Sequence, residues 1–302
     1  MSDNWLWDRS GAPDPEIEQL EKVLAPLRYR HRAIAPAAAP RHGWAAAAAV
    51  VAAAVGLTIW GVPRASQTEW EVAGTKVRQG QVLLTGSEAV RIEAENVGRV
   101  DLAPNSLLRA AGEKRLSLER GQLHAFIWAP PREFVVDTPS ARAVDLGCEY
   151  TLSVDASGDG LLKVSLGWVA FAVDGRESFI PADAECRTRK HGGPGIPYFQ
   201  DAPDALRAGV AAFDRGDRGV LPRILESARD RDGLSLWHLM TRVQGQDRAA
   251  VYNRLAQLVK LPAEASREAI LRGDARAIDE AWNALGLENT GWWRGWERNW
   301  KE

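Results

Sequence analysis

The side chains of this chain that could carry out chemistry are few and lie far apart in the sequence. Its 302 residues include two cysteines, Cys148 and Cys186. In an oxidising compartment this pair is a candidate disulfide, and the bridge would stabilise the fold by about 3 to 4 kcal/mol if unstrained. The alternative is that both are small buried thiols, because sequence spacing does not show whether their Cβ atoms meet.

No other pattern indicates a catalytic or metal-binding site. The five histidines lie in different segments, so they lack the spacing of metal ligands. These residues are His31, His42, His124, His191 and His238. A P-loop, a dinucleotide-binding fingerprint and a nucleophile elbow are also absent from the sequence. The sequence therefore predicts a protein that is not an enzyme and that needs no cofactor or metal.

The composition is that of a folded chain rather than a nucleic-acid-binding one. Hydrophobic residues make up 45% of the chain and charged residues 26%, and the length allows about two domains. The net charge of -2 and the pI near 6.3 argue against the concentrated basic surface of a nucleic-acid binder. Protein partners are therefore expected, and nucleic acid is not.

The tryptophans near the C-terminus form a regular pattern. Trp292, Trp296 and Trp300 are spaced four apart in "TGWWRGWERNWKE", with basic residues on other faces, which predicts a short amphipathic helix. Such a helix could lie in a membrane interface, dock on a partner, or fold back alongside Trp282.

An uncharged segment between His42 and Pro63 predicts a transmembrane helix. Trp44–Val62 contains nineteen residues without a charge, enough to cross roughly 30 Å of hydrocarbon. Trp44 and Trp60 stand where interfacial aromatic residues are expected. The apolar drive comes from Val50, Val51, Val55, Leu57, Ile59 and Val62. The alternative is an alanine-rich buried helix of a soluble protein.

The charges beside this segment predict its orientation. Four arginines precede it without an acidic residue among them, and fewer basic residues follow it closely. This excess favours a cytoplasmic N-terminus. We therefore expect a single-pass protein of the bacterial inner membrane whose C-terminal domains are periplasmic.

Residues 1–43 form the predicted cytoplasmic segment, with one amphipathic helix. Asp14 can cap this helix and Pro15 suits its first position. Its apolar face contains Ile17, Leu20, Leu24 and Leu27. An isolated helix of this length is marginal in water, so the face is expected to pack against a cytoplasmic partner, a second copy, the membrane or the segment itself.

The rest of the chain divides into a β-rich and a helical region. After a linker at 63–69, residues 70–190 show short alternating runs separated by turn residues, which predicts an all-β domain. A glycine- and proline-rich linker is expected at 191–200. Residues 201–302 then predict about six short helices, with Gly216 and Gly273 as C-terminal caps and Asp217 and Asp274 as N-terminal caps.

Several β-region motifs together resemble the FecR domain of bacterial single-span transducers. They are "GQVLLTG", "VDLAPNSLL", "LSLERGQL", "FVVDTPSARAVDLGCEYTLSV" and "LKVSLGWVAF", in the family's order over about residues 70–190. The resemblance implies a β-domain of twisted, solenoid-like or sandwich-like strands. It also implies a regulator that passes an extracytoplasmic signal to a cytoplasmic sigma factor.

The resemblance also gives roles to residues in "VDLGCEYTLSVD". The family pattern has a glycine and a small polar residue, usually threonine, before an aromatic strand. Gly147 and Tyr150 match this pattern, and Cys148 departs from it. We expect Gly147 to serve a bulge or a close approach of two backbones.

Two functions follow as hypotheses. The first is a membrane-anchored FecR-type signalling regulator, similar to an anti-sigma factor, that senses an extracytoplasmic partner. The second is a membrane-tethered periplasmic scaffold or protein- or glycan-binding module that makes no contact with a sigma factor. They differ in the role of the cytoplasmic segment.

Overall fold

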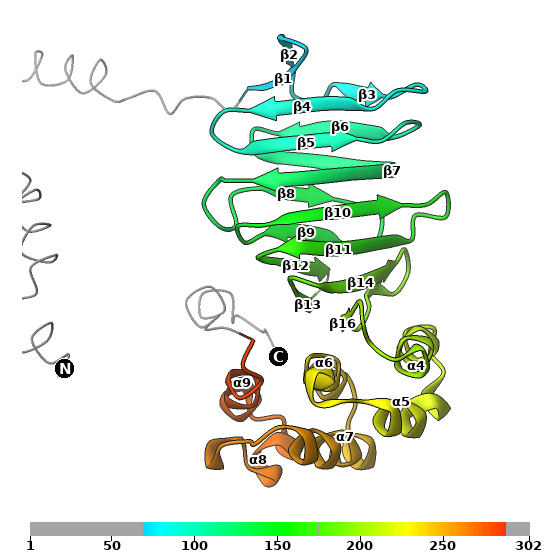
Figure 1. Cartoon of the computed structure of the whole chain (residues 1–302), viewed down its shortest axis with the longest axis vertical. Helices are drawn as coiled ribbons and strands as arrows, with labels where there is room; N and C mark the ends of the chain where they lie inside the picture. The colour runs from blue at the N-terminus through cyan, green and yellow to red at the C-terminus, as the bar shows by residue number, and fades with distance from the viewer. Residues whose placement is uncertain (1–68, 174, 288–302) are drawn as a thin grey trace, which may run out of the picture. The chain divides into compact units, whose positions relative to one another are not determined.

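A computed structural model describes residues 69–173 and 175–287, which lie in one compact unit (Figure 1). Strands occupy the first part of this unit and helices the second, which confirms the expected order of a β-domain and a helical region. No helix among these residues is long and apolar enough to cross a membrane. The predicted transmembrane segment, Trp44–Val62, lies outside the described residues.

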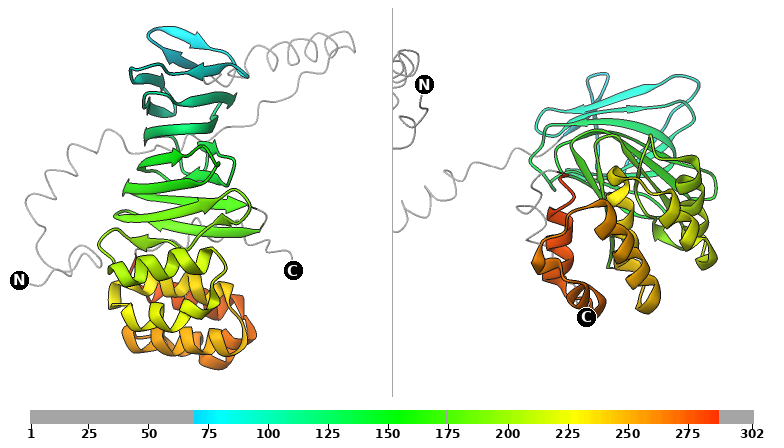
Figure 2. Two further views of the ribbon diagram at one scale, coloured as in Figure 1. Left: turned by 90° about the vertical axis from the view of Figure 1, so that its right-hand side faces the viewer. Right: turned by 60° about the horizontal axis from the view of Figure 1, so that its bottom comes forward.

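Within the described residues, sixteen strands form two layers that face each other across a shared core (Figures 1 and 2). One layer contains β1 (Trp70–Val72), β2 (Thr75–Val77), β4 (Val90–Ala94), β5 (Gly98–Leu102), β10 (Glu149–Val154), β11 (Gly160–Leu166), β14 (Ala184–Arg189), β15 (Gly193–Pro194) and β16 (Tyr198–Phe199). The other contains β3 (Val82–Leu84), β6 (Leu107–Gly112), β8 (Val135–Asp137), β9 (Arg142–Asp145), β12 (Trp168–Val173) and β13 (Arg176–Pro181).

Strand β7 (Arg115–Ile127) belongs to both layers. Its residues 115–120 pair with β6 and its residues 121–127 pair with β5 and β10. Gly121, at the corner, has a φ of 95°, and a Cβ there would lie 2.5 Å from Ser106 Cα. Only glycine fits both the left-handed backbone and this close approach, so one residue allows the chain to pass between the layers.

The core lies between the layers because side chains alternate along each strand. In β10 every second residue is buried, including Tyr150 and Leu152. The strand pairs are antiparallel except for β7 with β8, which is parallel. Many of the paired strands, such as β4 with β5 and β10 with β11, also follow each other directly in the sequence.

The helices cover the end of the sheet nearest β13 and β14 (Figure 1). They are α4 (Asp204–Asp214), α5 (Leu221–Ser227), α6 (Gly233–Arg242), α7 (Gly245–Leu258), α8 (Arg267–Arg272) and α9 (Ala275–Asn283), with 3₁₀ turns η2 (Arg218–Val220), η3 (Asp230–Asp232) and η4 (Ala263–Ala265).

The predicted helix caps are present. Gly216 and Gly273 have φ values of 99° and 79° at the ends of α4 and α8. Asp217 accepts a hydrogen bond from a backbone N–H of η2, and Asp274 accepts one from a backbone N–H of α9. Each glycine–aspartate pair therefore connects two helices, as the sequence predicts.

The segment 191–200 differs from the simple linker expected for it. It contributes the short strands β15 and β16, which both pair with β14. Ile196, Tyr198 and Phe199 are buried. These apolar residues hold the segment against the sheet, so the helices follow it without a flexible spacer.

Candidate functional site

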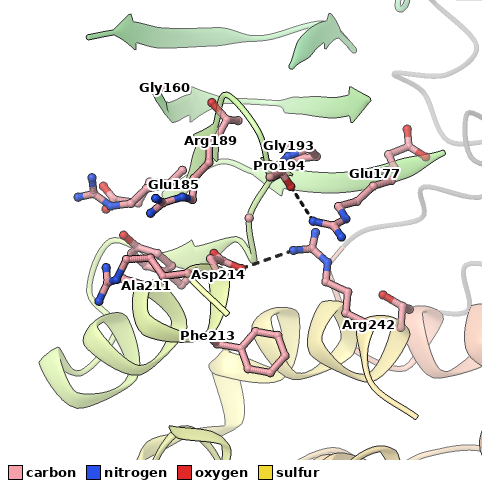
Figure 3. A pocket seen from close by; sticks show the side chains of 18 of the residues that line it. Gly160, Glu177, Glu185, Arg189, Gly193, Pro194, Ala211, Phe213, Asp214 and Arg242 are labelled. Atoms are coloured by element: carbon pink, nitrogen blue, oxygen red, sulfur yellow. Dashed lines mark hydrogen bonds and ion pairs between the residues drawn. The ribbon is translucent and has the colours of Figure 1, made fainter. Parts of the chain in front are cut away.

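A cleft of about 1320 Å³ opens between the end of the sheet and the helices (Figure 3). Strands β13, β14 and β15 provide one side, and residues of α4, α6 and α9 provide the other. Because the cleft is built from both regions, anything bound in it would contact the sheet and the helices together.

A buried polar network joins the two sides of this cleft. Arg242, at the end of α6, donates a 2.5 Å hydrogen bond to Ser178 Oγ on β13, and its Nη1 lies 3.8 Å from Asp214 Oδ1 on α4. Asp214 Oδ2 accepts a 3.0 Å hydrogen bond from the Ile196 N–H, and Ser178 Oγ donates one of 2.7 Å to the Gly195 carbonyl. The network thus ties two helices to the last strands.

The two charged members of the network stabilise each other's ionised form. Burial raises the pKa of the Asp214 carboxyl, whereas the positive charge of Arg242 lowers it. Burial lowers the pKa of Arg242, whereas Asp214 raises it. Removing either partner would leave the other as a buried, unpaired charge.

Cys186 lies in the same network. Its Sγ donates a 3.3 Å hydrogen bond to the Gly195 carbonyl, and its side chain is fully buried. Burial raises the pKa of this thiol to about 12, although nearby Arg242 acts in the opposite direction. Since the thiolate is the reactive form, burial disfavours reaction at Cys186.

An aromatic cluster forms the apolar part of the junction. The ring of Trp282 on α9 lies 5.9 Å from Trp168, 5.6 Å from Phe179 and 4.7 Å from Trp237, measured between ring centroids. His238 Nε2 accepts a 3.0 Å hydrogen bond from the Phe179 N–H, and its Nδ1 lies 2.9 Å from a carbonyl one turn earlier. These contacts assign the neutral tautomer with its proton on Nδ1.

The predicted residues Gly147, Cys148 and Tyr150 surround a second buried carboxyl group, that of Asp145. The Gly147 N–H donates a 2.8 Å hydrogen bond to Asp145 Oδ1, and the Cys148 thiol donates to Asp145 Oδ2. Burial raises the pKa of Asp145 to about 7, with the thiol and the N–H opposing this rise. Tyr150 Oη is buried and has no hydrogen-bond partner among the described residues.

The architectural role expected for Gly147 is divided between two positions. Gly147 has a φ of 88°, and a Cβ there would meet no atom within 4 Å, so its backbone conformation alone favours glycine. The close approach lies instead at Gly167, where a Cβ would be 2.0 Å from the Gly147 carbonyl oxygen. A register shift follows between Glu149 and Tyr150.

The structure keeps the two cysteines as free thiols. Cys186 lies opposite Leu162, and Leu162 lies opposite Leu152, which follows Cys148 by four residues. The cysteines are thus about 13 Å apart along the strands and about 10 Å apart across them. A disulfide needs Cα atoms within about 7 Å, so the buried-thiol alternative is the one that the fold adopts.

Other predicted site residues lie outside the described residues. They are the apolar face of the N-terminal helix (Ile17, Leu20, Leu24, Leu27), the membrane segment (Trp44, Val50, Val51, Val55, Leu57, Ile59, Trp60, Val62) and the tryptophans Trp292, Trp296 and Trp300. Of the predicted site residues, the structure therefore brings together Gly147, Cys148 and Tyr150 around Asp145, and it places Cys186 apart from them in the cleft network.

The sequence reasoning missed the charged residues of the cleft. Arg187 and Arg189 alternate along β14 and are exposed, a pattern that resembles any solvent-facing strand. Asp214 and Arg242 end two separate helices, and nothing in their local sequence marks them as partners. The available signal was the recurrence of arginine in "ECRTRK", next to a predicted linker.

Comparison with known proteins gives a family match for part of the β-region. Residues 81–170 match the family model described as FecR protein. The resemblance seen in the sequence motifs is thereby confirmed for the segment from just before β3 to within β12. A search of curated proteins gives no match.

Two solved structures of candidate anti-sigma factors from Parabacteroides distasonis are similar to parts of the chain. The first has 14% identity and a TM-score of 0.35, and the match covers 42% of this chain and 63% of the solved chain. The second has 13% identity and a TM-score of 0.35, and the match covers 48% of this chain and 74% of the solved chain. The chain thus spans less than two thirds of the first structure.

Proposed function

We propose that the protein is a membrane-anchored signalling regulator of the FecR type that controls a sigma factor. The observation that carries this proposal is the match of residues 81–170 to the FecR family. A regulatory role also agrees with a sequence that lacks the motifs of an enzyme. In this proposal the sheet and helices receive a signal from an extracytoplasmic protein partner.

The anchor in this proposal is Trp44–Val62. Its nineteen uncharged residues are long enough to span the bilayer as a helix. With the N-terminus in the cytoplasm, the strands and helices would lie in the periplasm of a bacterial cell.

The contact with the sigma factor is assigned to the apolar residues near the N-terminus. Ile17, Leu20, Leu24 and Leu27 recur at helical spacing and would form one face. A helix with one apolar face binds partners by placing that face in a groove.

Capture of cytoplasmic partners by the full-length chain tests the proposal. We expect the tagged chain to retain a sigma factor, and expect Leu20→Asp and Leu24→Asp to abolish retention by placing a charge in an apolar contact. Gln19→Asp adds the same charge outside the apolar set and serves as the matched control. Failure of the unaltered chain to retain any sigma factor would contradict the proposal.

The cleft favours a second candidate function. It lies beside helices that extend beyond the FecR match, and it is large enough for a peptide or a sugar chain. A membrane-tethered scaffold or binding module would use this region and need no sigma factor, so it is the function that a negative capture result would support.

A further inference from the structure

The seven arginines that line the cleft differ in whether they have an acidic partner. Arg207 pairs with Asp204, and Arg242 lies beside Asp214. The others make no ion pair with any residue in the described part of the chain. They are Arg176, Arg187, Arg189, Arg215 and Arg218.

The seven acidic residues of the lining are held by ion pairs, by hydrogen bonds or by other interactions. Asp155 and Asp159 accept backbone hydrogen bonds of 2.8 Å and 3.0 Å, and Glu185 lies 3.4 Å from a lysine of β11. Glu177 and Asp279 also interact with other residues. The formal charges of the lining balance, but five of its arginines have no acidic partner among the described residues. Among these five, Arg176 donates a 2.7 Å hydrogen bond to the Gly192 carbonyl and Arg218 lies over the Phe213 ring.

The charges of three guanidinium groups in the lining act on one carboxylate. Arg176 and Arg189, together with Arg242, each lower the pKa of Asp214. Arg176 also lowers the pKa of Arg242, as a nearby like charge does. Three arginine charges therefore act on Asp214, which lies beside Arg242 in Figure 3.

The buried arginine of this group retains an unused donor. Arg242 is 11% exposed, and its Nη1 makes no hydrogen bond within the described structure. A buried N–H without an acceptor is costly, and Asp214 Oδ1, at 3.8 Å, is too far away to accept a hydrogen bond from it, so Arg242 retains donor capacity that the described residues do not use. The donor lies between β13, α4 and α6, where the cleft meets the polar network.

We propose that Arg176, Arg189 and Arg242 form a binding site for an oxyanion, a carboxylate or a phosphate, carried by a ligand that occupies the cleft. Arginine suits this role because its planar donors match the paired oxygens of such groups. The cleft, at about 1320 Å³, exceeds the roughly 300–1000 Å³ of most small-molecule pockets, so the ligand extends beyond one anionic group. The site does not depend on contact with a sigma factor.

Calorimetric titration of the full-length chain tests this site with three probes: inorganic phosphate, hexaglutamate and the neutral peptide hexaglutamine. We expect binding of at least one anionic probe, weakening with added salt, and no binding of hexaglutamine. Arg176→Gln and Arg189→Gln should each weaken binding about tenfold or more, because each removes charge-assisted hydrogen bonds. Thermal unfolding of each variant establishes that it is folded.

Arg223→Gln is the matched control, because Arg223 is an exposed arginine of α5 outside the cleft lining. Its binding should equal that of the unaltered chain. Binding of phosphate alone would assign a phosphate-bearing ligand, and binding of hexaglutamate alone an acidic peptide. Absence of binding by both anionic probes, or binding that the Arg176 and Arg189 substitutions leave unchanged, would overturn the proposal.

Discussion

Two buried carboxyl groups, Asp145 between the strands and Asp214 at the junction with the helices, are stabilised in different ways. Asp145 is fully buried and receives hydrogen bonds from the Gly147 N–H and the Cys148 thiol, which are neutral donors. Asp214 receives one backbone hydrogen bond and lies beside the guanidinium group of Arg242.

The difference shows in what opposes the rise of each pKa. Burial raises both pKa values, and that of Asp145 reaches about 7 because no cation opposes the change. At Asp214 the arginine charges oppose it. Asp145 avoids a buried charge by holding its proton near neutral pH, whereas Asp214 keeps its charge and needs a partner. The strands therefore contain a protonatable group, and the junction contains an ion pair.

The largest effect should come from breaking the ion pair at the junction. Arg242→Met would leave Asp214 buried without its counter-charge and remove the donor to Ser178. We expect the free energy of unfolding to fall by about 3 to 5 kcal/mol. Urea denaturation of the full-length chain would measure this change.

A double variant separates the lost charge from lost packing. Asp214→Asn combined with Arg242→Met removes both charges and should recover most of the loss, because no unpaired ion remains. If the double variant is as unstable as Arg242→Met alone, packing and not charge accounts for the effect.

The second effect is a pH dependence that arises from Asp145. Its pKa is about 7 in the folded protein and 3.8 as a model value, so the folded state holds this proton more tightly. The stability that protonated Asp145 contributes is therefore fully present below about pH 4 and is lost as the pH rises to about 7. The free energy of unfolding should fall over this range by up to about 1.4 kcal/mol per pH unit. Denaturation midpoints measured from pH 4 to pH 8 would follow the loss.

Asp145→Asn isolates this contribution. The variant keeps an acceptor for the Gly147 N–H but has no proton to lose, so its stability should vary less with pH across this window. Asp230→Asn, at an exposed position, is the control and should leave the pH dependence unchanged. Equal slopes for Asp145→Asn and the unaltered chain would place the titration elsewhere.

The same two regions show how far the sequence could predict the structure. Strand alternation and turn residues identified the β-region, and the glycine–aspartate pairs identified the helix caps, because these signals are local. Asp145 reads as an ordinary turn residue beside Gly147. Asp145 is buried by the layers above and below it. The residues next to it in the sequence do not indicate this packing.

The candidate site was harder still to predict. Arg242 and Ser178 are 64 residues apart, and their hydrogen bond exists because α6 packs on β13. The segment 191–200 resembled a linker through its glycines and prolines, although Tyr198 and Phe199 pair with β14. Both features depend on contacts between segments that are far apart in the sequence. A single sequence contains the two partners of such a contact but does not indicate that they meet.

A smaller effect is expected from the turn that positions Asp145. Gly147→Ala places a Cβ in open space but at a φ of 88°, which L-residues disfavour. We expect a loss of about 1 to 2 kcal/mol from backbone strain alone. Gly86→Ala, which meets no atom and lacks a positive φ, is the control and should cost less. Equal losses for the two variants, measured by urea denaturation, would exclude strain as the cause.

The smallest effect concerns the thiol at the position where the FecR pattern usually has threonine. Cys148 donates to Asp145 through a weak S–H donor. Cys148→Ser substitutes a hydroxyl group, whose stronger hydrogen bond favours the ionised carboxyl, so the pKa of Asp145 should fall by about half a unit to one unit. The pH window of stability loss would then shift to lower pH, away from neutrality. An unchanged window in Cys148→Ser would mean that the donor at position 148 does not set the pKa of Asp145, and that burial and the Gly147 N–H determine it.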